Sequence, residues 1–286
     1  MKKIFFGLLI FSGFFSNAQI IRKYSNEFLN IGAGARGLAM GGAVISNQND
    51  VYSPMWNPAG LIDIDRDWQG AAMHAEYFES IAKYDYIAFA KPLDNKGGVF
   101  ALSIVRLGVD NILNTTQLID SEGNIDYDKI TSFSQSDYAA LLSYAFRPGS
   151  HRLSVGINAK MVYRNVGKFA SGYGFGFDLG VLYNADNGIN YGAMLRDATT
   201  TVNFWTVNQD ELSAVVNGEE FNPAPKDKME ITMPKLNLGI SKNFELNRDL
   251  ELLPEAGLNI DFAKTAAVIS TDFASITPYA GAELKF

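Results

Sequence analysis

The 286-residue sequence contains no cysteine and only two histidines. The missing cysteine excludes a disulfide framework, a cysteine nucleophile and a thiolate metal site. Basic residues are fewer than acidic ones, 24 against 31, which gives a formal charge of −7 and a pI near 4.9. No basic run occurs, so a nucleic-acid partner, which calls for clustered Lys and Arg, is not expected.

Apolar runs long enough to span a membrane as a helix are also missing. Residues 4–15 form an apolar stretch of roughly 12 residues, whereas a spanning helix needs about 20. Lys2 and Lys3 precede this stretch, and Ser16-Asn17-Ala18 follows it as a small-residue cleavage site. We therefore predict a signal peptide over residues 1–18. The exported chain is then either a soluble secreted protein or a membrane β-barrel.

From Trp68 onward, apolar and polar residues alternate with the period of two that is typical of strands with one apolar face. In residues 173–183, for example, aromatic and aliphatic residues alternate with Gly and Asp. A soluble sandwich would turn the apolar face inward, whereas a membrane barrel would turn it to lipid. Alternation alone leaves both open. The predicted strands cover residues 68–79, 83–92, 97–108, 136–147, 151–164, 171–184, 188–198, 233–244, 250–262 and 276–286.

Connection lengths favour the membrane barrel. Tight turns alternate with mostly long segments, of which 109–135, 199–232 and 263–275 are the longest. Outer-membrane barrels show this pattern because their periplasmic turns are short and their surface loops long. The aromatic content is 13%, and several aromatics fall toward strand ends, as an interfacial girdle requires: Tyr144, Phe146, Tyr163, Tyr173, Tyr183 and Tyr191. We predict an all-β fold, an antiparallel transmembrane β-barrel over residues 68–286, surrounded by outer-membrane lipid.

The segment between the signal peptide and the first strand, residues 19–67, is rich in small residues and turns. We predict that it forms an N-terminal plug, or hatch, in one mouth of the barrel. Its glycine spacing matches the dinucleotide fingerprint by letter, but the buried strand and βαβ unit which that fingerprint requires are absent. Close packing against the wall is expected instead, and no cofactor. The motif residues are Gly32, Gly34, Arg36, Gly37, Gly41, Gly42, Trp56, Asn57 and Pro58.

No catalytic or metal site is predicted. His74 and Glu76 share a strand face, but two ligands make no zinc site without a third. The acidic stretch 120–128 lacks the ligand spacing and the closing Glu of a calcium loop. Ionisable residues on the polar strand faces are expected to line the lumen, where they either brace the plug, the favoured role, or border a transport path. These are His74, Glu76, Lys160, Asp178, Arg196, Lys235, Asp261 and Glu283.

The plug segment and several later segments resemble the PorV/PorQ family of type IX secretion proteins. The plug carries small residues, then GGA, a run of Asn and Asp, and W-N-P-A; residues 22–29, 74–78, 81–86 and 119–125 also look like family sequence. The resemblance covers most of the mature chain and implies a FadL-like barrel of fourteen strands. About ten strands are predicted here. The chain is therefore either a smaller barrel or a C-terminally truncated copy, and a match that continues to Phe286 favours truncation.

The resemblance implies a non-enzymatic outer-membrane component of the type IX system. It would bind or shuttle secreted cargo through C-terminal sorting domains, and it would meet translocon or attachment-complex proteins. Residues 109–135 and 199–232 are the expected cargo contacts because they are the longest loops. The alternative is FadL-like transport of hydrophobic small molecules. An apolar pocket between plug and wall would support it, and a lumen crowded with paired charges would count against it. A third possibility is a structural barrel in a surface or gliding complex.

Overall fold

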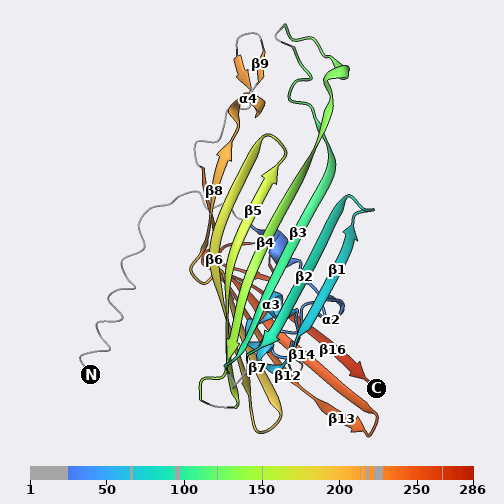
Figure 1. The fold of residues 1–286 in the computed structure, drawn as a ribbon, viewed down its shortest axis with the longest axis vertical. Coiled ribbons are helices and arrows are strands. Elements are labelled where there is room, and N and C mark those ends of the chain that lie inside the picture. Colours follow the sequence, from blue (N-terminus) through green and yellow to red (C-terminus); the bar gives the residue numbers. More distant parts are fainter. Residues whose placement is uncertain are drawn as a thin grey trace, which may run out of the picture.

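The computed structural model describes residues 25–64, 67–93, 97–120, 122–149, 151–212, 214–216, 219–221, 228–265 and 267–286. Most of its strands belong to one antiparallel sheet that curls around a small N-terminal segment (Figure 1). The predicted signal peptide lies outside the described residues. Within the described ranges, no helix has the length and apolar character needed to cross a membrane.

The wall of the described chain contains ten strands, each antiparallel to the next and overlapping the ranges predicted from alternation. Strand β1 pairs with β2 only, and β16 pairs with β14 and the two-residue β15 (Ile269–Ser270). No pairing joins β1 to β16 among the described residues. The wall strands are β1 (Gln69–Tyr77), β2 (Ala82–Pro92), β3 (Val99–Asn114), β4 (Thr131–Phe146), β5 (Leu153–Val166), β6 (Ala170–Asn184), β7 (Ile189–Arg196), β12 (Lys235–Lys242), β14 (Leu250–Asp261) and β16 (Ser275–Lys285).

The two longest predicted loops, residues 109–135 and 199–232, contain regular structure, which corrects their assignment as loops. β3 and β4 continue as a tall hairpin as far as Asn114 and Thr131, and η5 (Tyr127–Lys129) lies in the segment that joins them. In the second segment β8 (Thr201–Val207) pairs with the upper half of β6, and β11 (Met229–Thr232) pairs with β8. Backbone pairing drives both extensions, and backbone hydrogen bonds need no apolar alternation. Also present are α4 (Gln209–Leu212), β9 (Ala214–Val216) and β10 (Glu219–Phe221).

These extensions rise from one end of the wall, which we call the loop end (Figure 1). The strand ends that short connections join, β2 to β3, β4 to β5 and β6 to β7, lie at the opposite end, which we call the turn end, together with β13 (Phe244–Asn247). The segregation of long and short connections to opposite ends agrees with the expected asymmetry of an outer-membrane barrel.

The polarity of the wall is that of a membrane barrel and not of a soluble sandwich. On β6, Phe175 and Phe177 are 57% and 48% exposed on the outer face, whereas Asp178 is only 4% exposed on the inner face. β5 follows the same rule, since Asn158 and Lys160 are buried while Met161 is exposed. An outer surface this apolar is stable in lipid and not in water.

Aromatic side chains mark two levels on the outer face. Toward the loop end, Tyr138, Tyr163 and Tyr173 are in register, with ring centroids 6.3 and 4.9 Å apart. Toward the turn end, the rings of Tyr183 and Tyr191 lie 6.4 Å apart. Tyr173 and Tyr183 are ten positions apart on β6. At a rise of about 3.3 Å per residue and a tilt of about 40°, the rows are roughly 25 Å apart, the height of an outer-membrane apolar band.

The N-terminal segment lies inside the curl of the sheet toward the turn end (Figure 1). Its elements are short: η2 (Glu27–Asn30), α2 (Ala35–Ala39), α3 (Ser53–Trp56) and η3 (Pro58–Asp63). The left-handed backbone of Gly41 and Gly42, with φ of 63° and 82°, turns the chain directly after α2. The segment buries an apolar core against the inner faces of β1 to β5. We call residues 25–64 the plug.

Wall glycines let the plug approach closely. A Cβ atom at Gly156 would overlap the backbone of Pro58 and Ala59, and one at Gly180 would overlap Asn57 and Pro58. A Cβ atom at Gly192 would likewise overlap the carbonyl of Ile45. Glycine at these wall positions is therefore a packing requirement of the plug and not of the strands.

A leucine at Gly180 is expected to displace the plug. Overpacking of this kind costs about 1–3 kcal/mol, so Gly180→Leu should lower the midpoint of thermal unfolding, followed by heat-modifiable gel migration of the detergent-solubilised protein. Val181→Leu, the adjacent position on the outer face, is the control and should leave the midpoint unchanged. Equal midpoints for the two variants would show that the plug does not depend on this contact.

Candidate functional site

The plug is organised around the Trp56 indole. Cβ atoms at Gly32 and Gly37 would collide with this ring, and one at Gly42 would lie 3.3 Å from it. The indole Nε1 donates a hydrogen bond to the carbonyl of Ala33, at 2.8 Å. Three of the predicted motif glycines therefore form the cradle of the predicted motif tryptophan. Gly34 does the same for the Tyr52 ring, 2.9 Å from its ideal Cβ position.

Asn57 and Pro58 form the corner that joins plug to wall. The Asn57 side-chain amide is fully buried and donates to the carbonyls of Ile45, at 2.9 Å, and of Val181 on β6, at 3.1 Å. Its Oδ1 accepts from the backbone N–H of Ala59, at 3.1 Å, and so caps η3. The Asn57 side chain thus makes hydrogen bonds with backbone groups of both the plug and the wall.

Two carboxylates of the wall hold the other side of the plug. Arg36 donates from Nε to Glu283 on β16, at 2.9 Å. Glu255 on β14 accepts from the Ser46 hydroxyl and the Asn47 amide, each at 2.6 Å. Glu283 is among the residues predicted to line the lumen, whereas Glu255 is not. The period-two alternation of the strand could have identified Glu255, because Glu255 lies six positions before Asp261 and therefore shares its inner strand face.

A buried ion triad braces the wall next to α3. The Lys160 ammonium lies 2.8 Å from Asp178 and 2.6 Å from Asp197, and its side chain is 3% exposed. Asn158 connects this triad to the plug by donating to the Pro54 carbonyl, at 2.9 Å, and to Asp178, at 3.1 Å. Asp197 was missed because it follows the end of β7 in a left-handed conformation, where no strand periodicity applies.

His74 and Glu76 do not line the lumen, which corrects their predicted position. Both side chains are about half exposed on the outer face of β1, and His74 contacts Asp85 at 2.6 Å. The inner face of β1 carries Ala71, Met73, Ala75 and Tyr77, which pack against the plug core. The apolar residues of this strand face the plug rather than lipid, because the plug offers an apolar surface there.

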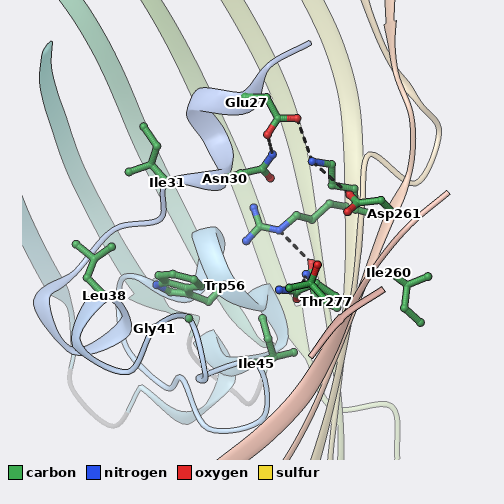
Figure 2. A pocket seen from close by; sticks show the side chains of 15 residues that line it. Glu27, Asn30, Ile31, Leu38, Gly41, Ile45, Trp56, Ile260, Asp261 and Thr277 are labelled. Carbon is green, nitrogen blue, oxygen red and sulfur yellow. Dashed lines mark hydrogen bonds and ion pairs between the residues drawn. The ribbon is translucent and has the colours of Figure 1, made fainter. Parts of the chain in front are cut away.

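A cavity of about 440 Å³ lies between the plug and the inner face of β7, β12, β14 and β16. Figure 2 shows Trp56 and Ile45 on the plug side and Asp261 and Thr277 on the wall side. Three of the predicted lumen residues, Arg196, Lys235 and Asp261, meet here. The complete lining is Glu27, Asn30, Ile31, Leu38, Gly41, Gly42, Ile45, Trp56, Arg196, Lys235, Asn237, Asn259, Ile260, Asp261 and Thr277.

The charged residues of this cavity are already engaged. The Lys235 ammonium lies 3.1 Å from Glu27 of the plug and 3.5 Å from Asp261 of the wall. Arg196 donates to the carbonyls of Leu29, at 3.4 Å, and Met55, and to Asn237, at 3.3 Å. The same two cations therefore brace the plug and border the cavity.

Two carboxylates outside the wall strands have structural explanations. Burial raises the pKa of the Asp63 carboxyl of η3, against the opposing effect of its ion pair with Arg147. Hydrogen bonds from Asn124 lower the pKa of Asp120, which also accepts from the N–H of Glu122 at 2.9 Å. The acidic loop around Asp120 is thus a self-capped turn. No group of three or more metal-ligating residues occurs among the described residues.

Comparison with known proteins bears on the fold. No protein-family model matches the chain, and no curated protein does. The structure is similar to that of the Pseudomonas putida toluene transporter TodX, with a TM-score of 0.50 and 14% identity over 87% of this chain and 76% of that one. A TodX deltaS2S3 mutant, described as a monoaromatic hydrocarbon channel, matches over the same shares at 14% identity and a TM-score of 0.48.

The similarity to TodX shows the fold, an antiparallel β-barrel of the outer-membrane type. The predicted fold class, an antiparallel FadL-like β-barrel with a small plug, is confirmed. These solved structures are transporters or channels and not enzymes. None of the matches is to a PorV/PorQ protein, so that resemblance stays a prediction.

The Lys160 triad offers a direct stability test. Lys160→Met leaves Asp178 and Asp197 buried without a cation, and breaking a buried pair in this way costs about 3–5 kcal/mol. The free energy of unfolding in urea should fall by that amount. Lys83→Met is the matched control, since Lys83 and Asp110 pair 2.9 Å apart at a solvent-exposed position. A loss no larger than that of the control would show that the triad does not stabilise the barrel.

Proposed function

We propose that the protein is a non-enzymatic outer-membrane channel for small, largely apolar molecules, with the cavity between plug and wall as its binding site. The observation that carries this proposal is the cavity itself. Its volume of about 440 Å³ lies within the usual ligand-pocket range of roughly 300–1,000 Å³. The similarity of the fold to a toluene transporter supports the same class of function.

The plug side of the cavity suits an apolar guest. Ile31, Leu38, Ile45 and Trp56 border it, and an apolar ligand that covers these side chains leaves water on entering. The charged wall residues hold the plug in place, so they maintain the shape of the cavity while the apolar side chains contact the guest.

Passage through the barrel requires movement of the plug, because the plug fills the lumen toward the turn end. The contacts between plug and wall differ in strength. Asn57 and Ser46 are fully buried against the wall, whereas the Arg36–Glu283 pair is about one-quarter exposed. The partly exposed pair is screened by water and is the weaker restraint. The part of the plug around Arg36 is therefore the part expected to shift during passage.

Filling the cavity should block uptake. Leu38 borders the cavity and is 36% exposed, so Leu38→Trp adds bulk there without overpacking the core. Uptake of radiolabelled toluene by cells that express the protein should fall at least fivefold. Leu113→Trp, on the tall β3–β4 hairpin, is the control and should transport normally. Equal uptake by cells with and without the wild-type protein would refute the channel.

A second candidate is the type IX role that the PorV/PorQ resemblance implies. The observation that favours it is the tall β3–β4 hairpin together with the β8–β11 extension, both at the loop end. The β3–β4 hairpin continues beyond the level of Tyr138 on β4, so it would project beyond the membrane, whereas β8 pairs with β6 at the level of Tyr173 itself. Exposed hairpins of this kind can add strands to the sheet of a β-rich cargo domain.

Deletion of the hairpin tip distinguishes the two candidates. Removal of residues 116–129 should abolish co-purification of proteins with C-terminal sorting domains if the hairpin grips cargo, while the barrel stays folded because the deleted residues lie outside its wall. Toluene uptake should be unaffected by the same deletion. Unchanged cargo recovery from a folded variant would count against the type IX role, and a purely structural barrel would show neither activity.

A further inference from the structure

We propose that the plug–wall cavity selects neutral amphiphiles, with an apolar body and a hydrogen-bonding alcohol or amide group, over carboxylates of the same chain length. This inference rests on the proposed channel function and names the class of molecule that the channel takes. It follows from the charge balance of the cavity, from the hydrogen bonds already made there, and from the polar atoms that remain.

The charges of the cavity lining sum to zero. Arg196 and Lys235 contribute two positive charges, and Glu27 and Asp261 contribute two negative ones. A carboxylate guest would bring a net negative charge into a partly enclosed space. Such a charge binds well only where an unpaired cation or several donors receive it.

Neither cation is available to such a guest. Lys235 is placed between two carboxylates, at 3.1 and 3.5 Å. Arg196 directs its guanidinium at Asn237 and at the plug carbonyls of Leu29 and Met55. A carboxylate would have to break a plug-holding contact in order to pair with either cation. It would also approach the Glu27 and Asp261 carboxylates, which repel it.

Neutral polar atoms remain open on both the plug side and the wall side of the cavity. The Thr277 hydroxyl, the Asn259 Nδ2 and the Asn30 Oδ1 line the cavity and have no hydrogen-bond partner among the described residues. Together they include both a donor and an acceptor. An alcohol or an amide satisfies such a set without any change of charge, whereas a hydrocarbon with no polar group leaves it unused.

The arrangement of the lining supports an elongated guest with two unlike ends. Figure 2 shows Ile31, Leu38 and Trp56 on one side and Asp261 and Thr277 on the other. The apolar body of an amphiphile would cover the plug side chains, and its polar group would meet the Asn and Thr side chains of the wall.

The test uses three probes with one chain length: 1-octanol, octanamide and octanoate. Binding to the full-length, detergent-purified protein is measured at pH 8 by equilibrium dialysis. The wild-type protein should bind 1-octanol and octanamide at least tenfold more tightly than octanoate. Tighter or equal binding of octanoate would overturn the inference and leave the channel proposal standing. No binding of any probe would overturn the channel proposal itself.

Charge-altered variants test the cause of the preference. Glu27→Gln removes one partner of Lys235 and leaves the cavity with a net positive charge. A unit charge about 5 Å away at an effective dielectric constant of about 20 is worth more than tenfold in affinity, so the affinity for octanoate should rise at least tenfold relative to the affinity for 1-octanol. Asp261→Asn makes the same change from the wall side and covers the case in which Glu27→Gln fails to fold.

Glu76→Gln is the matched control, because Glu76 lies on the outer face of β1 and shares no contact with the cavity. It should leave all three affinities at their wild-type values. Unchanged octanoate affinity relative to 1-octanol in whichever of the two cavity variants is folded would overturn the inference.

Discussion

Asn57 and Pro58 lie so close to Gly156 and Gly180 that a single methyl group at either wall position would collide with the plug. This contact fixes the depth and direction of the plug, and the other plug–wall interactions follow from it. With this corner in contact with the wall, the Asn57 amide donates a hydrogen bond to the wall carbonyl of Val181. α3, directly before the corner, then brings the carbonyls of Pro54 and Met55 to Asn158 and Arg196.

The lumen is stabilised in a different way from a soluble core. Beside the apolar core that the plug shares with β1 to β5, the inner face of β5, β6, β7, β12, β14 and β16 carries Gly, Asn, Ser and ionisable residues. Such residues are stable away from water only when their hydrogen bonds and charges are satisfied. The plug supplies hydrogen-bond partners for these residues from its backbone carbonyls as well as from its side chains, as the Asn158–Pro54 and Arg196–Leu29 hydrogen bonds show.

The same charged residues therefore hold the plug and border the cavity. The charges that hold the plug, Lys235 with Glu27 and Arg196 with the plug carbonyls, are also the charges that border the cavity. Because each is already neutralised or hydrogen-bonded, the cavity is polar without carrying net charge. In the proposed channel, the two roles weighed for the lumen residues, plug bracing and a transport path, would fall on the same side chains.

Local pattern in the sequence was sufficient for the β-barrel fold and its ten wall strands, because period-two alternation and turn residues act over a few neighbouring positions. It could not place His74 and Glu76, since the face that a strand buries depends on what packs against it, and β1 faces an apolar part of the plug. It also could not reveal Asp197, which pairs with Lys160 across 37 positions. Contacts between residues distant in the chain form the cavity and decide its charge balance, so only the tertiary structure determines them.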